Sequence, residues 1–235
     1  MPVVGTQQSP ILVVREDTIW ANFPGQTLDV RYVKGVHDGE FDVFENNFVF
    51  KAPYQTLVVD GQPWDLRKIH IHRHAEHLLT EYRRDEPRPS DFEVHLVHLK
   101  AGEHSGPKVV LGAFFHKQKD AETPEGFLRL DEALRTARKD GQGRQRYMKL
   151  GVDPLDFLPP DRSRWYRYEG SLTSGTFSED VSWFLFPNEF GIDLDKIKTL
   201  AVNAEQHPRP VFSLDRRFVL GVTTDFARRR VATGV

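Results

Sequence analysis

The chain has 235 residues, a length that suits one domain with a sizeable hydrophobic core. Its apolar fraction of 39% and charged fraction of 28% are ordinary for a soluble protein, and a net charge of −2 favours neither nucleic acid nor an anionic membrane as a partner. Cysteine is absent, which excludes disulfides, thiolate metal ligands and thiol nucleophiles. A bound metal would therefore need histidine or carboxylate ligands.

We expect a single domain over residues 1–235, with a loose N-terminal arm at 1–10 and a C-terminal tail at 224–235. No apolar run approaches the roughly 20 residues of a membrane-spanning helix, and no signal peptide is visible. The sequence as written indicates a cytoplasmic protein, or a periplasmic or secreted one whose leader has been removed. The pattern leaves the oligomeric state open, a homodimer included.

The first sixty residues alternate short apolar runs with turn signals such as Asp38-Gly39 and Asp60-Gly61. This texture predicts many short strands in a large sheet or sandwich. The predicted strands are residues 11–14, 28–33, 41–44, 48–50 and 56–59.

Residues 69–74 read as one strand that carries three histidines at every second position. Alternate side chains share a face, so His70, His72 and His74 line up on one side. Residues 92–99 predict a second strand, with Glu93 and His95 on one face. Three imidazoles from neighbouring strands, with a fourth position left open for water, are typical of a catalytic zinc site.

The second half of the chain adds further strands and only short helices. Residues 109–115 and 181–186 predict buried strands, and 211–214 and 218–222 return to strand character. Apolar residues at helical spacing predict a helix over 130–139, with Gly141 as a stop, and a short helix over 193–201.

Several motifs follow one another in a fixed order along nearly the whole chain. They are Gln-Ser-Pro-Ile at 8–11, His-x-His at 70–72, Glu-His at 76–77, Glu-x-His-x-Val-His at 93–98, Tyr-x-Gly-Ser-Leu-Thr at 168–173, Val-Ser-Trp at 181–183, Arg-Pro at 209–210 and Leu-x-x-Arg at 214–217. In these motifs and in their order the sequence resembles the α-class carbonic anhydrases.

The resemblance implies a mostly β fold: one domain around a large, mostly antiparallel twisted sheet with a few short helices. It also implies zinc held by His70, His72 and His95. The implied activity is that of a lyase, in which a zinc-bound hydroxide reversibly hydrates carbon dioxide to bicarbonate and a proton. The expected partner is this small substrate.

The resemblance further implies a role for each residue around the zinc. Glu93 would accept the other ring N–H of His95 and so fix its tautomer, and the Thr173 hydroxyl would be oriented by Glu76. An apolar wall would hold carbon dioxide, with Ser174 following Thr173 beside it. By motif position, that wall consists of Val97, Val110, Leu172, Val181 and Trp183.

Two positions depart from the family pattern. Lys68 stands where active members carry a glutamine that accepts a hydrogen bond from the first histidine ligand, and lysine has donors but no acceptor. The family's proton-shuttle histidine should fall near residues 46–48, where the chain reads Asn46-Asn47-Phe48. We therefore expect proton transfer to limit turnover.

Two other functions are compatible with the same residues. One is an acatalytic relative that uses the carbonic anhydrase scaffold as a binding module. The other is a cupin-type enzyme, because His70-x-His72-x-x-x-Glu76 has the spacing of a cupin motif that binds iron or manganese.

Overall fold

The computed structural model describes residues 5–20, 28–52, 55–137, 139–140, 143–205 and 208–223. Its strands are β1 (Leu12–Val14), β2 (Ile19–Trp20), β3 (Leu28–Arg31), β4 (His37–Asp42), β5 (Asn47–Phe50), β6 (Thr56–Val59), β7 (Gln62–His72), β8 (Leu78–Thr80), β9 (Phe92–Lys100), β10 (Lys108–Lys117), β11 (Lys139–Asp140), β12 (Gly143–Arg144), β13 (Tyr147–Val152), β14 (Arg164–Gly170), β15 (Val181–Ile192) and β16 (Leu220–Thr223). Its α-helices are α1 (Glu125–Thr136) and α2 (Lys198–Asn203), and its 3-10 helices are η1 (Arg15–Asp17) and η2 (Pro154–Phe157).

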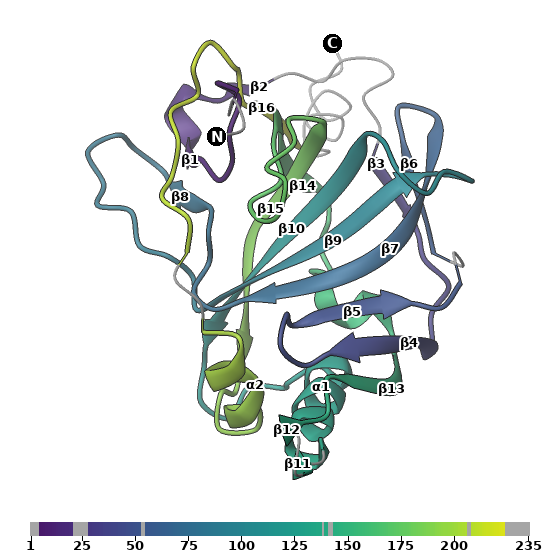
Figure 1. The fold of residues 1–235 in the computed structure, drawn as a ribbon. Helices are drawn as coiled ribbons and strands as arrows, with labels where there is room; N and C mark the ends of the chain where they lie inside the picture. Colours follow the sequence, from purple (N-terminus) through teal and green to yellow (C-terminus); the bar gives the residue numbers. More distant parts are fainter. Residues whose placement is uncertain are drawn as a thin grey trace, which may run out of the picture.

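A 12-stranded twisted sheet dominates the described part of the chain, with the order β13-β4-β5-β7-β9-β10-β15-β14-β16-β2 and with β3 and β6 beside β7 (Figure 1). Most neighbours are antiparallel, whereas β10 pairs with β15, and β16 with β2, in parallel. The predicted fold class, a large and mostly antiparallel sheet with few short helices, is therefore confirmed.

Both faces of the central strands are covered. On one face Ile69 and Ile71 of β7 and Leu96 of β9 belong to a large apolar cluster, which includes residues of α1 and α2. These two helices lie together at the lower end of Figure 1. The opposite face of β7 and β9 carries the histidines, and a smaller apolar cluster around Trp183 packs beside them. Strand alternation thus separates the main core from the polar site.

Some predicted boundaries were wrong. The helix predicted at 130–139 begins five residues earlier, directly after Pro124, and ends at Thr136. The strand predicted at 211–214 is reduced to a single bridge between Phe212 and Ile11. Strand β7 ends at His72, so His74 does not continue the histidine row. The errors in the helix and in β7 fall at the end of an element, where side-chain periodicity carries little information, whereas the error at 211–214 concerns a whole predicted strand.

The predicted N-terminal arm is not loose at its inner end. Ser9 is fully buried, and its backbone N–H donates to the Ser171 hydroxyl (2.9 Å). The guanidinium groups of Arg209 and Arg217 donate to the carbonyl oxygens of Ser9 and Gln8, both at 2.8 Å. The predicted tail at 224–235 lies outside the described residues. In the described part of the chain, no helix is long and apolar enough to cross a membrane.

His98 shows how a buried histidine makes this fold sensitive to acid. Its Nδ1–H donates to the Val109 carbonyl (3.0 Å), so Nε2 accepts from the Tyr32 hydroxyl (2.5 Å). Burial lowers the pKa of His98 to about 4. The unfolded chain protonates this ring below about pH 6.5, whereas the folded chain keeps it neutral.

We therefore predict that the unfolding free energy of the metal-free protein falls as the pH drops from about 6.5 to 4, with about 3 kcal/mol coming from His98. Denaturant titrations over this range should show a weaker pH dependence for His98→Gln. The exposed His104 provides the control, since His104→Gln should keep the wild-type slope. Equal slopes for the wild type and His98→Gln would contradict the prediction.

Candidate metal centre

The register between β7 and β9 brings the predicted histidines together. His70 lies directly opposite His95, and His72 lies opposite Glu93. The ring centroid of His72 is 4.1 Å from that of His70 and 4.6 Å from that of His95, while the His70 and His95 centroids are 6.4 Å apart. All three imidazoles are buried.

Each of the three histidines has a ring nitrogen available, and in His70 and His95 a hydrogen bond holds the other one. Nε2 of His95 donates to Glu93 Oε1 (2.8 Å), which leaves Nδ1 free to bind a metal. Nδ1 of His70 donates to Asn47 Oδ1 (2.8 Å), which leaves Nε2. Nε2 of His72 is buried and has no hydrogen-bond partner among the residues that the structure describes. Oriented imidazoles with one unused nitrogen are the donor set that zinc prefers, so the residues fit this metal.

Burial also sets the protonation state of these rings. Burial and then the neighbouring histidines hold the pKa of His70 and His72 well below its ordinary value. The two rings are therefore neutral at physiological pH, and neutral imidazole is the form that binds metals.

Glu93 is the hub beneath the histidines. Its Oε1 accepts from His95 and from Nδ1 of His77 (2.7 Å), and its Oε2 accepts from the backbone N–H groups of Glu76 and His77, both at 2.9 Å. Burial alone would raise the pKa of Glu93, but the facing His77 and His95 bring it well below its ordinary value. The carboxylate stays charged and fully hydrogen-bonded in the interior.

Gly112 of β10 makes room for this hub. It lies opposite His95, and a Cβ at this position would approach a Leu185 methyl carbon to 2.6 Å and Glu93 Oε1 to 3.2 Å. A side chain here would press on the carboxylate that orients His95.

Asn47 is the residue that sequence reasoning missed. Lys68 indeed offers no acceptor, but Asn47 on the neighbouring strand β5 lies opposite His70 and accepts the hydrogen bond of that ring. Lys68 instead lines the hollow beside the histidines, and burial lowers the pKa of its amine. Finding Asn47 required the register between β5 and β7, which places it opposite His70; the sequence of β7 alone does not show it.

The other histidines of the motifs have separate partners. Nε2 of His77 is hydrogen-bonded to the Tyr168 hydroxyl (2.6 Å), which is hydrogen-bonded to the Ser9 hydroxyl (2.8 Å). His77 therefore supports Glu93 from behind. His98 pairs with Tyr32 on the opposite face of β9, away from the site.

Glu76 and Thr173 lie on the other side of the histidines. Both are buried. Burial raises the pKa of Glu76, whereas the Thr173 hydroxyl is placed to favour the charged form of this carboxylate and lowers its pKa. Its Oε2 lies 3.4 Å from His72 Nε2 and has no hydrogen-bond partner among the described residues.

A small hollow of about 20 Å³ opens beside the histidines, which is room for about one water molecule. Its polar lining includes Thr173 and Ser174. Val181 is buried in the same apolar cluster as Trp183. The predicted wall residues that line the hollow are Val97, Val110, Leu172 and Trp183.

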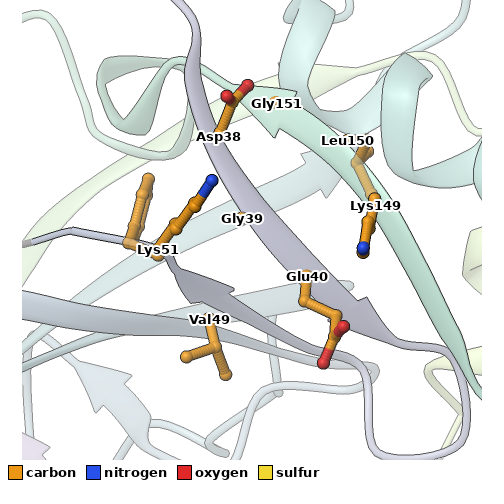
Figure 2. Close-up of a pocket in the computed structure, with 9 residues that line it drawn as sticks. Asp38, Gly39, Glu40, Val49, Lys51, Lys149, Leu150 and Gly151 are labelled. Carbon is orange, nitrogen blue, oxygen red and sulfur yellow. The ribbon is translucent and has the colours of Figure 1, made fainter.

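A larger hollow of about 600 Å³ lies on β4, β5 and β13 (Figure 2). The register places its Val49 opposite Lys68, so this surface adjoins the histidine site on the same face of the sheet. It lacks the donor set of a metal site, and we therefore place the site at the smaller hollow. Its charged lining residues are Asp38, Glu40, Lys51 and Lys149.

Comparison with known proteins identifies the family. A family model described as eukaryotic-type carbonic anhydrase matches residues 2–218, and the chain belongs to this family. The carbonic anhydrase of Nostoc sp. (strain PCC 7120) is 28% identical over 208 residues, covering 82% of this chain and 73% of that protein. That of Neisseria gonorrhoeae is 28% identical over 224 residues, covering 92% and 77%.

Solved structures agree with the fold. The α-carbonic anhydrase of Thermovibrio ammonificans, in complex with the inhibitor sulfanilamide, superposes with a TM-score of 0.71 at 28% identity, covering 93% of this chain and 88% of that one. These findings confirm the resemblance and remove the cupin-type alternative. The relatives also include a dioscorin of Dioscorea polystachya, 25% identical over 76% of this chain and 60% of that protein, so membership does not by itself fix the activity.

Asn47 and Lys68 give opposite expectations for metal affinity. We predict that Asn47→Leu weakens zinc binding about 10- to 100-fold, because Nδ1 of His70 loses its acceptor. Lys68→Gln should change the affinity less than about threefold, since Asn47 still holds the ring. Zinc titrations against a chromophoric chelator measure both constants. A larger loss in Lys68→Gln than in Asn47→Leu would contradict this assignment.

Proposed function

We propose that this protein is a zinc-dependent carbonic anhydrase that interconverts carbon dioxide and bicarbonate. The observation that carries the proposal is the cluster of three buried imidazoles, each with one unused nitrogen, next to a small hollow with an apolar wall. The sequence relationship to carbonic anhydrases supports the same activity.

His70, His72 and His95 would hold the metal. When bound, zinc supplies a Lewis acid that makes a water-derived nucleophile available near neutral pH. The three rings are uncharged ligands and leave the positive charge of the ion undiminished, which favours ionisation of water. Asn47 and Glu93 contribute by holding two of the rings in the required tautomers.

Thr173 and Glu76 would orient the nucleophile. The Thr173 hydroxyl would donate a hydrogen bond to Glu76, which leaves its oxygen to accept one from the reacting group. Since the Thr173 oxygen can then only accept, it favours a nucleophile that has an O–H group to donate. The charged form of Glu76 is needed as acceptor.

The apolar wall would hold the substrate, which has no strong polar group. Val97, Val110 and Trp183 occupy one cross-strand row next to the histidine row, so the strand register itself builds the wall. Lys68 continues this row on the polar side. The positive charge of Lys68 would attract the bicarbonate anion to this end of the row.

The test of the proposal is carbon dioxide hydration by zinc-loaded protein in a stopped-flow assay. We expect hydration that a chelator abolishes and that His95→Ala lacks, because loss of one of three ligands removes both tight zinc binding and rate. The exposed His104→Ala should retain both. Stoichiometric zinc without hydration would contradict the proposed activity and favour a binding module.

The pathway of the released proton gives a second prediction. The side chain of Asn46 is hydrogen-bonded to the Asn203 carbonyl, Asn47 is engaged by His70, and Phe48 is buried. No side chain of residues 46–48 can therefore carry a proton to solvent. We predict that turnover at saturating carbon dioxide rises several-fold with the concentration of small imidazole buffers. A buffer-independent turnover would contradict it.

A further inference from the structure

Glu76 reaches the histidines through a short connection. Only three residues separate it from His72 at the end of β7. The backbone of this connection is fixed by hydrogen bonds from Arg73 N to the Ala204 carbonyl (3.0 Å) and from Ala75 N to the Ser90 carbonyl (3.0 Å). The backbone N–H of Glu76 donates to Glu93 (2.9 Å). The Glu76 carboxylate is thus held close to the ring that precedes it by four residues.

Two buried polar atoms face each other at this point. Oε2 of Glu76 lies 3.4 Å from Nε2 of His72, and both atoms are buried without a hydrogen-bond partner among the described residues. The side chains are only 6% and 4% exposed. Buried polar atoms are nearly always satisfied in native proteins, so this pair indicates a missing partner. A direct hydrogen bond does not supply it.

A shared metal ion accounts for both atoms. Ligand atoms of His72, Glu76 and His95 all lie within 4.8 Å of one another. Zinc bonds to nitrogen and carboxylate oxygen are about 2.0–2.2 Å long, so tetrahedral geometry separates neighbouring ligand atoms by about 3.4 Å. The 3.4 Å between His72 Nε2 and Glu76 Oε2 matches this separation.

We propose that Glu76 binds the metal directly through Oε2 in a resting form of the site. This inference rests on the metal site of the proposed function, though not on carbon dioxide hydration. In the resting form the carboxylate occupies the position that water or an anion would otherwise take. The site opens when Glu76 leaves the metal and accepts a hydrogen bond from the Thr173 hydroxyl instead. Small metal-binding anions therefore compete with a ligand supplied by the protein itself.

Cobalt(II) reports on this ligand without reference to activity. Metal-free wild type, Glu76→Gln and the exposed control Glu86→Gln are loaded with cobalt and titrated with azide, followed by visible absorption. We expect Glu76→Gln to bind cobalt about 10- to 100-fold more weakly and azide at least about tenfold more tightly than the wild type. Glu86→Gln should match the wild type. Equal cobalt and azide constants for the wild type and Glu76→Gln overturn the proposal.

A crystal structure of the zinc-loaded wild type decides the same question without a variant. Zinc within about 2.2 Å of Glu76 Oε2 supports the proposal, and a separation above about 3 Å overturns it. A distant Glu76 in a protein that hydrates carbon dioxide overturns this inference alone and leaves the proposed function intact. A wild type that binds neither zinc nor cobalt overturns both.

Discussion

The structure depends on one register, that between β7 and β9. With His70 opposite His95 and His72 opposite Glu93, all three ligand candidates and the carboxylate that orients His95 share one small area of sheet. A slip of β7 by one residue would turn His70 and His72 into the main core and bring Ile69 and Ile71 to the site. Burial of Ile69 and Ile71 in the main core therefore determines that His70 and His72 face the site.

Glu93 converts that register into a rigid site. A buried carboxylate is costly unless it is fully paired, and Glu93 accepts hydrogen bonds from two imidazoles and two backbone N–H groups. The second imidazole, His77, is itself held by Tyr168. Removing any member would leave the others buried and unpaired, so the network stabilises the fold and the ring orientation together.

Periodicity and motif order were enough to predict the mostly antiparallel sheet, the family and the positions that converge at the site. They failed where the answer lay across strands or at the end of an element. Asn47 became visible as the acceptor for His70 only from the β5–β7 register. His74 was counted in the histidine row, although β7 ends before it. The closeness of Glu76 to His72 depends on the path of a three-residue connection, which has no periodic signature.

The contacts of the segment around Ser9 affect how the protein folds during synthesis. The Ser9 hydroxyl is hydrogen-bonded to the Tyr168 hydroxyl, and the Gln8 carbonyl accepts a hydrogen bond from Arg217, which is 209 positions away in the sequence. The support behind His77 is therefore assembled from segments that lie far apart in the sequence. During synthesis the ribosome must release Arg217 before that support can close, so β7 and β9 are made well before all the contacts that fix their histidine side chains are available.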